Sequence, residues 1–347
     1  MDKKTSCRIL VILFLVLAVG CAVQFVQKPK KETCEKQIFA MNTVMTFQAY
    51  GENAAEAVEA AAEEVNRLSA LLSISEETSE VFAVNKAGQG ELSEDTAKIL
   101  ERALDIYEQT DGAFDCTIYP VMQLWGFPTK EYHVPAEEKI EETLKLVDSS
   151  KIEVQPLYVF LGADQKIDFG GIAKGYASDR AIEIFEAYGI ESGMVSLGGN
   201  IKVLNRKPDG SLWNVGIRNP KGAEADSIAA IKVENKALVT SGGYERYFEE
   251  DGNTYIHIID PKTGYPAKNG LASVTIVSED GMLADALSTS LFVMGEEKAM
   301  EFWRDSKEIF DMVLVTEDER ILVTEGLEDK ISVKGKYILI NKSVNCD

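Results

Sequence analysis

Residues 168–180 read DFGGIAKGYASDR, with three glycines, a lysine and two aspartates ahead of a helical pattern. The glycines at 170, 171 and 175 are out of place in a helix interior, where each costs up to about 1 kcal/mol relative to alanine. Two interpretations stay open. The glycines pack a tight strand-to-helix turn, or they let backbone amides and Lys174 face an anion at the start of a helix expected over about 173–188. This is not a Walker loop, because Lys174 precedes its glycine and no Ser or Thr follows in the required place.

The hydrophobic spacing on either side of this stretch predicts a mixed fold. Apolar residues at helical spacing predict helices over 54–72 and 95–107. Alternation of β-branched residues predicts strands over 44–50, 194–204, 212–217, 227–233, 255–259, 273–277 and 312–315. Because these strands come in neighbouring runs as well as between helices, we expect an α+β fold with mixed, largely antiparallel sheets and packed helices. No linker or repeat interrupts 38–343, which we interpret as a single catalytic or binding domain.

Composition limits the partners. The chain has 347 residues, 45% of them apolar, and a net charge of −21 spread along its length. The apolar fraction is enough for a real core, and the charge argues against a large nucleic-acid interface. A phosphate-rich ligand would therefore need local devices such as backbone amides, a few cations or a metal ion.

The N-terminus has the layout of a secretory signal. Lys3, Lys4 and Arg8 precede an apolar run over 9–19, which is shorter than the roughly 20 residues of a bilayer span. The end of the run, LAVGC, resembles a bacterial lipobox, so we expect a lipoprotein signal peptide over 1–20, a lipidated Cys21 and a polar tether over 21–37. An uncleaved signal anchor is the alternative, and both place the rest of the chain outside the cytoplasm on a membrane tether. Cys34, Cys116 and Cys346 form no CxxC motif, and a disulfide among them stays open.

The segment ADALSTSLFVMG (284–295) is a candidate metal site. Asp285 and Thr289 are four residues apart, so on a helix a carboxylate and a hydroxyl share one face and can reach a hard cation. The alternative is an Asp that complements the helix dipole and a Thr that bonds to its own backbone.

Two further segments carry candidate residues. His257, one of two histidines, lies in a strand-like run that leads into a DPKTG turn, and it is either a proton donor or acceptor for phosphate chemistry or a satisfied, half-buried side chain. Residues 110–127, TDGAFDCTIYPVMQLWGF, suit an extended loop that walls a flat ligand, although Phe114, Trp125 and Phe127 could equally be core.

Together these segments belong to a set of eight motifs that resembles the signature of the FAD:protein FMN transferases, formerly described as thiamine-biosynthesis lipoproteins. The resemblance covers about residues 38–320. The motifs are MNT (41–43), GAFD (112–115), LWGF (124–127), DFGGIAKGYASD (168–179), SLGGN (196–200), TSGGYERYF (240–248), HIIDPKTGYP (257–266) and ADALST (284–289).

The resemblance implies an enzyme on the outer face of the bacterial cytoplasmic membrane. Such an enzyme splits FAD at its pyrophosphate, moves FMN onto a Thr or Ser hydroxyl of an acceptor protein and releases AMP. The implied acceptor is a membrane redox subunit with a D-x-x-[ST]-G-A-T motif. An FAD pyrophosphatase giving FMN and AMP and a non-catalytic flavin-binding lipoprotein remain alternatives, whereas a serine hydrolase is disfavoured because G-x-S-x-G is absent.

The resemblance also implies roles for particular residues. FAD is the expected substrate, and the residues that would line its binding site are Met41, Ala113, Phe114, Asp115, Asp168, Lys174 and His257. Mg²⁺ would be held by the backbone carbonyl of Gly171 together with Asp285 and Thr289. Asp285 and His257 are the expected catalytic residues, and His257 either activates the acceptor hydroxyl or assists the AMP leaving group. The chain departs from the family pattern at Asn42, Ser75, Cys116 and Gly243, which concerns flavin and adenine contacts rather than the metal residues.

Overall fold

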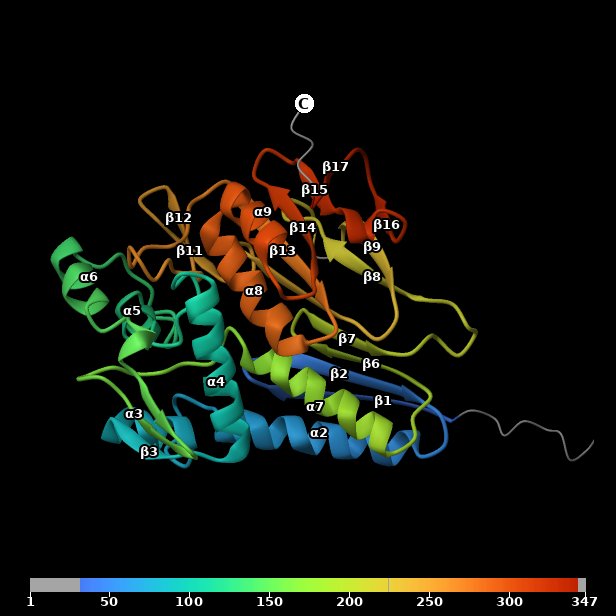
Figure 1. Ribbon diagram of the computed structural model, residues 1–347, viewed down its shortest axis with the longest axis horizontal. Coiled ribbons are helices and arrows are strands. Elements are labelled where there is room, and N and C mark those ends of the chain that lie inside the picture. The colour runs from blue at the N-terminus through green and yellow to red at the C-terminus, as the bar shows by residue number, and fades with distance from the viewer. Residues whose placement is uncertain (1–31, 224, 343–347) are drawn as a thin grey trace, which may run out of the picture.

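A nine-stranded sheet forms the centre of the computed structural model, which describes residues 32–342 except 224 (Figure 1). Neighbouring strands are antiparallel apart from β15 and β17, which are parallel. The expected α+β fold with largely antiparallel sheets is confirmed. In spatial order the strands are β1 (Thr33–Ala40), β2 (Thr43–Tyr50), β6 (Ser192–Leu197), β7 (Asn200–Leu204), β10 (Ala237–Gly242), β13 (Leu271–Ser278), β14 (Asp311–Thr316), β15 (Ile321–Thr324) and β17 (Ile338–Ile340).

The turns of two hairpins lie next to each other, at the same end of the neighbouring strands β2 and β6. Met41 and Asn42 join β1 to β2 with φ of 45° and 62°, and Gly198 and Gly199 join β6 to β7 with φ of 61° and 97°. Two positive φ angles define the type I′ turn that matches the twist of a hairpin. The prediction of one strand over 194–204 is therefore wrong, because the chain reverses at the two glycines.

Helices cover one face of the sheet and bury the larger core. α2 (Ala54–Leu71) packs on β1 and β2, α7 (Ala173–Ala187) on β6 and β7, and α8 (Gly281–Met294) on β10 and β13. In Figure 1 these three helices lie on the viewer's side of the sheet, with α9 (Glu296–Asp305) following α8. α8 lies against both the sheet and α7, which is why it is apolar on nearly every face.

A small sheet covers the opposite face of the large sheet, over strands β7, β10, β13, β14 and β15. It consists of β8 (Trp213–Arg218), β9 (Ser227–Val233) and β16 (Ile331–Val333). Val215 and Ile231 of this sheet pack with Leu238 and Val313 of the large sheet in a second core. The molecule is thus layered as helices, large sheet and small sheet.

The remaining elements form the end of the molecule at the left of Figure 1 and hold a third apolar cluster around Trp125 and Phe127. Residues 110–127 are not an extended loop, because they contain a short helix and Phe114, Trp125 and Phe127 are buried. The elements of this end and its neighbours are α3 (Glu80–Ala87), β3 (Gln89–Glu91), α4 (Glu94–Gln109), α5 (Tyr119–Leu124), α6 (Glu137–Leu144), η1 (Ser149–Lys151), β4 (Glu153–Gln155), β5 (Tyr158–Phe160), β11 (Tyr247–Glu250) and β12 (Asn253–Ile256), and η2 (Glu325–Leu327) lies after β15.

The predicted strand over 255–259 is shorter than expected. β12 ends at Ile256, and the chain then enters the DPKTG turn, where the Gly264 N–H donates to the Asp260 carbonyl at 2.8 Å. His257 therefore follows the strand and makes a last backbone bond to Arg246, at 3.0 Å.

Some predictions concern residues outside the described part of the chain. The predicted signal peptide, Cys21 and Cys346 lie there, while β1 begins at Thr33, within the range that we assigned to the tether. Cys34 and Cys116 are free thiols. No helix in the described part of the chain is long and apolar enough to cross a membrane.

Candidate active site

The crossing of α7 and α8 brings the predicted metal residues together. A Cβ built on Gly171 would lie 3.8 Å from Thr289 Oγ1, and Lys174 Nζ lies 3.8 Å from Asp285 Oδ1. The Gly175 N–H donates to Asp285 Oδ2 at 2.9 Å. The turn at 168–172 and the helix α8, which are more than a hundred residues apart in sequence, therefore form one site.

Glycines allow this close approach. A Cβ on Gly175 would meet the Gly281 carbonyl oxygen and lie 2.8 Å from Asp285 Cβ, and one on Gly281 would lie 2.7 Å from the Gly175 carbonyl oxygen. Contacts this short would force the backbones apart. Of the two interpretations of the glycines, packing thus explains Gly175, while Gly171 lies beside Thr289 and Phe114.

Lys174 provides the positive charge of the site. It is half-buried and donates to the Gly170 carbonyl at 3.2 Å. Burial raises the pKa of Asp168, against the opposing effects of the Gly170 N–H and the charges of Lys174 and Arg246. The lysine charge also acts on Glu245 and His257, so these groups surround one region.

The donor atoms at the crossing fit a hard cation. Asp285 is only 3% exposed and supplies a carboxylate, and Thr289 supplies a hydroxyl that lies 3.2 Å from Ser241 Oγ at the end of β10. Within the described residues, no group of three His, Cys, Asp or Glu side chains could hold a metal on its own. A cation here would have one carboxylate and would take further ligands from water and substrate phosphates, which is the usual arrangement for Mg²⁺.

His257 is held in one orientation and one charge state. Its Nδ1 lies 3.2 Å from the Arg246 carbonyl oxygen, so Nδ1 carries the proton and donates, and Nε2 keeps its lone pair. Burial, then the charges of Arg246 and Lys174, lowers the pKa of His257 to about 4. At neutral pH the side chain is therefore a neutral imidazole that can accept a proton at Nε2.

Sequence reasoning missed Glu245, which lies in the same TSGGYERYF segment. Burial, together with the like charge of Asp285, raises the pKa of Glu245 to about 7, against the lowering effects of the charges of Lys174 and Arg218. A Cβ on Gly199 would lie 3.7 Å from Glu245 Oε1, which places the carboxyl group at the tip of the β6–β7 hairpin. The motif quoted from sequence contained the signal, but only its distant partners identify Glu245 as part of the site.

The triplet 113–115 separates the metal residues from a cavity. Phe114 faces Gly171, with its Cε2 atom 3.1 Å from the Cβ position of that glycine. Asp115 faces the other way and accepts hydrogen bonds from the Thr117 N–H at 2.8 Å and from Ser149 Oγ at 2.6 Å. The Asp115 carboxylate is therefore used within the fold, and a role in FAD binding stays a prediction, as it does for Ala113.

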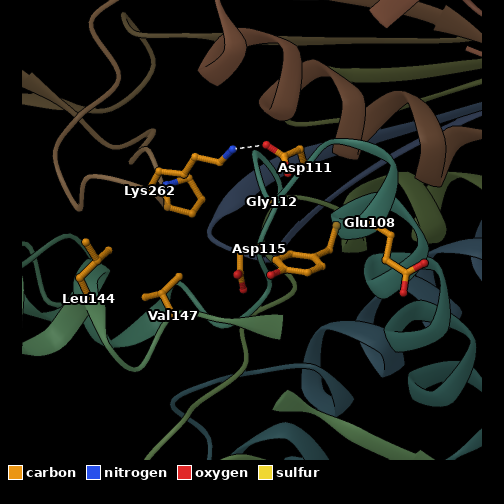
Figure 2. Close-up of a pocket in the computed structure, with 9 residues that line it drawn as sticks. Glu108, Asp111, Gly112, Asp115, Leu144, Val147 and Lys262 are labelled. Atoms are coloured by element: carbon orange, nitrogen blue, oxygen red, sulfur yellow. Dashed lines mark hydrogen bonds and ion pairs between the residues drawn. The ribbon is translucent and has the colours of Figure 1, made fainter. Parts of the chain in front are cut away.

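Figure 2 shows this cavity, of ≈ 490 Å³, between the end of α4, the loop after α6 and the DPKTG turn. Lys262 and Asp111 form an ion pair at one side of it. Asp115 is the one predicted site residue in its lining, so we assign the reaction site from the donor atoms at the α7–α8 crossing rather than from the cavity. Met41 lies at the tip of the β1–β2 hairpin, beside the β6–β7 hairpin, and its N–H donates to Ser69 Oγ at 3.1 Å. Its role in FAD binding stays a prediction.

Comparison with known proteins identifies the class. A crystal structure of the ApbE protein from Thermotoga maritima superposes with a TM-score of 0.81 at 35% identity, covering 86% of this chain and 99% of the other. The apo flavinyl transferase ApbE from Pseudomonas stutzeri gives 0.76 at 26% identity, with 86% and 97% covered. The fold and its site thus define an enzyme of the flavin-transferase class.

Sequence comparison identifies the family. The model of the ApbE family matches residues 41–314, and the chain belongs to this family. The FAD:protein FMN transferase of Treponema pallidum (strain Nichols) is 32% identical over 95% of this chain and 97% of its own length. That of Haemophilus influenzae is 35% identical over 74% and 77%. The resemblance inferred from the eight motifs is confirmed.

Proposed function

We propose that this chain transfers FMN from FAD to a Thr or Ser hydroxyl of an acceptor protein and releases AMP. The acceptor oxygen forms a bond to the phosphorus of the FMN phosphate, and the bond from that phosphorus to the bridging oxygen of AMP breaks. One observation carries the proposal: Lys174, Asp285 and Thr289, contributed by two crossing helices, form a compact site of one cation and oxygen donors. The relatives named above carry the same activity in their names.

Each residue has a part in this reaction. Lys174 balances phosphate charge, and Asp285 and Thr289, with the Gly171 carbonyl, would hold Mg²⁺. When bound, Mg²⁺ neutralises phosphate charge and favours displacement at phosphorus. The Phe114 ring, packed against Gly171, restricts the space beside the donors.

We assign His257 the role of base rather than acid. The neutral imidazole offers Nε2 as a proton acceptor, because Nδ1 is committed to the Arg246 carbonyl. The proton of the acceptor hydroxyl moves to Nε2 as the new bond to phosphorus forms.

FAD hydrolysis is the second candidate function. Lys174 and Thr289 are both half-buried, so water reaches the atoms that an acceptor hydroxyl would approach. The pyrophosphatase and the transferase share every residue described above and differ only in the nucleophile. The third candidate, a non-catalytic flavin-binding lipoprotein, is less favoured. Such a protein would not need the buried Asp285 carboxylate and the Thr289 hydroxyl side by side as cation ligands.

Location and acceptor complete the proposal. Lipidation of Cys21 would anchor the enzyme at the outer face of the bacterial cytoplasmic membrane, and the acceptor would be a membrane redox subunit with a D-x-x-[ST]-G-A-T motif. Both rest on the sequence patterns of the N-terminus and on the family.

Mass spectrometry of an acceptor domain tests the proposal. The domain is incubated with the protein from residue 22 onward, FAD and MgCl₂, with EDTA as the control. A metal-dependent mass gain of one FMN is expected, and Asp285→Asn should lower the rate about 10²-fold or more. FMN and AMP with an unmodified acceptor would establish the hydrolase instead, and intact FAD throughout would establish the binding protein.

A further inference from the structure

Arg218 is a cation beside the reaction site whose charge acts on Glu245, although the two side chains form no ion pair. It ends β8 and is half-buried, with its guanidinium carbon 4.7 Å from the centroid of the Tyr244 ring. Its Nε–H is buried and unbonded, and its side chain makes no hydrogen bond or ion pair within the described residues. Within the described part of the chain, the Nη groups of this guanidinium are neither buried nor hydrogen-bonded, so they can donate charged hydrogen bonds to a carboxylate.

Contacts connect this arginine to the metal residues. The Tyr244 ring lies over Gly242, since a Cβ there would be 2.9 Å from Tyr244 Cζ. Ser241 precedes Gly242, and its Oγ lies 3.2 Å from Thr289 Oγ1. The Tyr244 ring, Gly242 and Ser241 thus connect the guanidinium to the candidate metal site.

The other cations of this region are already engaged. Lys174 contacts the Gly170 carbonyl and Asp285, and Arg246 Nη2 donates to the Phe127 carbonyl at 2.7 Å. Arg218 comes from the small sheet that covers the far face, which contributes none of the residues expected to line FAD. In a chain of net charge −21, an acidic segment of another protein is repelled unless it meets an unpaired cation of this kind.

We propose that Arg218, held on Tyr244, is the docking residue for a carboxylate of the acceptor protein and so helps to set acceptor specificity. This inference rests on the transferase function proposed above. The carboxylate replaces water on the guanidinium and brings the neighbouring hydroxyl toward the donors at Thr289 and Asp285. Charged hydrogen bonds of this kind position the acceptor without taking part in the chemical step.

Steady-state kinetics with separate variation of the two substrates tests this role. The probes are wild type, Arg218→Gln and Arg218→Lys, with an acceptor domain and its variant in which the Asp of the D-x-x-[ST]-G-A-T motif is Asn. We expect Arg218→Gln to raise the KM for the acceptor about 10- to 100-fold, with the KM for FAD and the Mg²⁺-dependent release of FMN without acceptor unchanged. Arg218→Lys should recover part of the loss, because Lys keeps the charge but not the planar fork.

The acceptor variant and a matched control sharpen the result. The Asp→Asn acceptor should show the same rise with wild type and little additional rise with Arg218→Gln, because both changes remove one interaction. Lys207→Gln is the control, since Lys207 likewise lies over a ring, 5.7 Å from the Trp213 centroid at the opposite end of β8. It should leave both KM values unchanged.

Several outcomes overturn the inference. If Arg218→Gln raises the KM for FAD, the arginine holds a phosphate of FAD rather than the acceptor. If wild type transfers FMN and the acceptor KM of Arg218→Gln is unchanged, or the two substitutions add independently, the docking role fails while the transferase stands. If wild type yields only FMN and AMP, the proposed function and this inference fail together.

Discussion

At the scale of single residues, the proton on His257 and the absence of a Cβ at Gly175 have the clearest consequences. Both follow from backbone atoms: the Arg246 carbonyl takes the Nδ1–H of the histidine, and the Gly281 carbonyl leaves no space beside the glycine. Asn42 shows the same dependence, because its φ of 62° in the hairpin turn is a conformation that Asn tolerates in place of the commoner Gly.

His257→Asn tests the proposed base. The Asn amide can still donate to the Arg246 carbonyl but has no proton acceptor equivalent to Nε2, so FMN transfer should fall about 10²- to 10⁴-fold with the fold preserved. In wild type, kcat/KM should persist in mildly acidic solution and fall only as pH approaches the His257 pKa of about 4. Because Glu245 has a pKa of about 7, the same profile is measured in Glu245→Gln, and an acid limb at or above pH 6.5 in that variant, with free FAD as the varied substrate, would contradict the assignment.

The titration of His257 should also make the free energy of unfolding depend on pH, in a direction that its pKa shift defines. The unfolded chain binds a proton at His257 near the ordinary value of 6.5, and the folded chain only near 4. The free energy of unfolding should therefore fall as pH drops from 6.5 toward 4, because the unfolded state binds more protons there. Urea titrations of wild type and His257→Asn at several pH values measure the free energy of unfolding. Its fall between pH 6.5 and 4 should be smaller in the variant, by the contribution of His257.

At the scale of elements, the crossing of α7 and α8 holds the site together. Gly175 and Gly281 let the two helices approach, and the Gly175 N–H then reaches the Asp285 carboxylate at 2.9 Å. Packing and ligand geometry are coupled here, because the same contact sets the distance between the helices and the orientation of Asp285.

Gly175→Ala should disrupt both. The added methyl group forces the helices apart, so we expect a loss of about 1–3 kcal/mol in the free energy of unfolding, together with weaker metal-dependent activity. Gly216→Ala is the control, because a Cβ there meets only Ser227 Cβ at 3.6 Å, and it should change stability by less than about 0.5 kcal/mol. Denaturant unfolding measures both, and equal effects of the two substitutions would contradict the packing argument.

At the scale of the whole molecule, the shortage of protein ligands makes metal and FAD binding interdependent. Of the residues expected to hold the metal, only Asp285 supplies a carboxylate, and the described residues contain no group of three His, Cys, Asp or Glu side chains that could hold a metal ion. Phosphate oxygens of FAD would complete the coordination, so each ligand should strengthen the binding of the other by the same factor.

Calorimetry and thermal unfolding measure this coupling. Mg²⁺ alone should bind weakly and shift the Tm little, whereas Mg²⁺ with FAD should raise the Tm by several degrees. In Asp285→Asn, whose amide oxygen can still accept from the Gly175 N–H, FAD should bind without a metal effect. Tight Mg²⁺ binding in the absence of FAD would indicate a preformed metal site and contradict this account.

Much of the architecture was predictable from local patterns. The helices over 54–72 and 95–107 and the strands over 44–50 and 227–233 agree with α2, α4, β2 and β9 to within about two residues, because amphipathic spacing reports which face is buried. The hairpin at Gly198 and the helix α5 were missed, since apolar alternation continues through the first and aromatic residues conceal the second.

By itself, the sequence determined the fold class, the family motifs and the i, i+4 spacing of Asp285 and Thr289, because these depend on residues that are close in the chain. Only the tertiary structure decided why Gly175 is a glycine, which nitrogen of His257 carries its proton, and that Glu245 lies at the site. Those properties depend on distances and burial between segments far apart in sequence, such as the 110 residues that separate Gly175 from Asp285. No local pattern records such distances before the chain is folded.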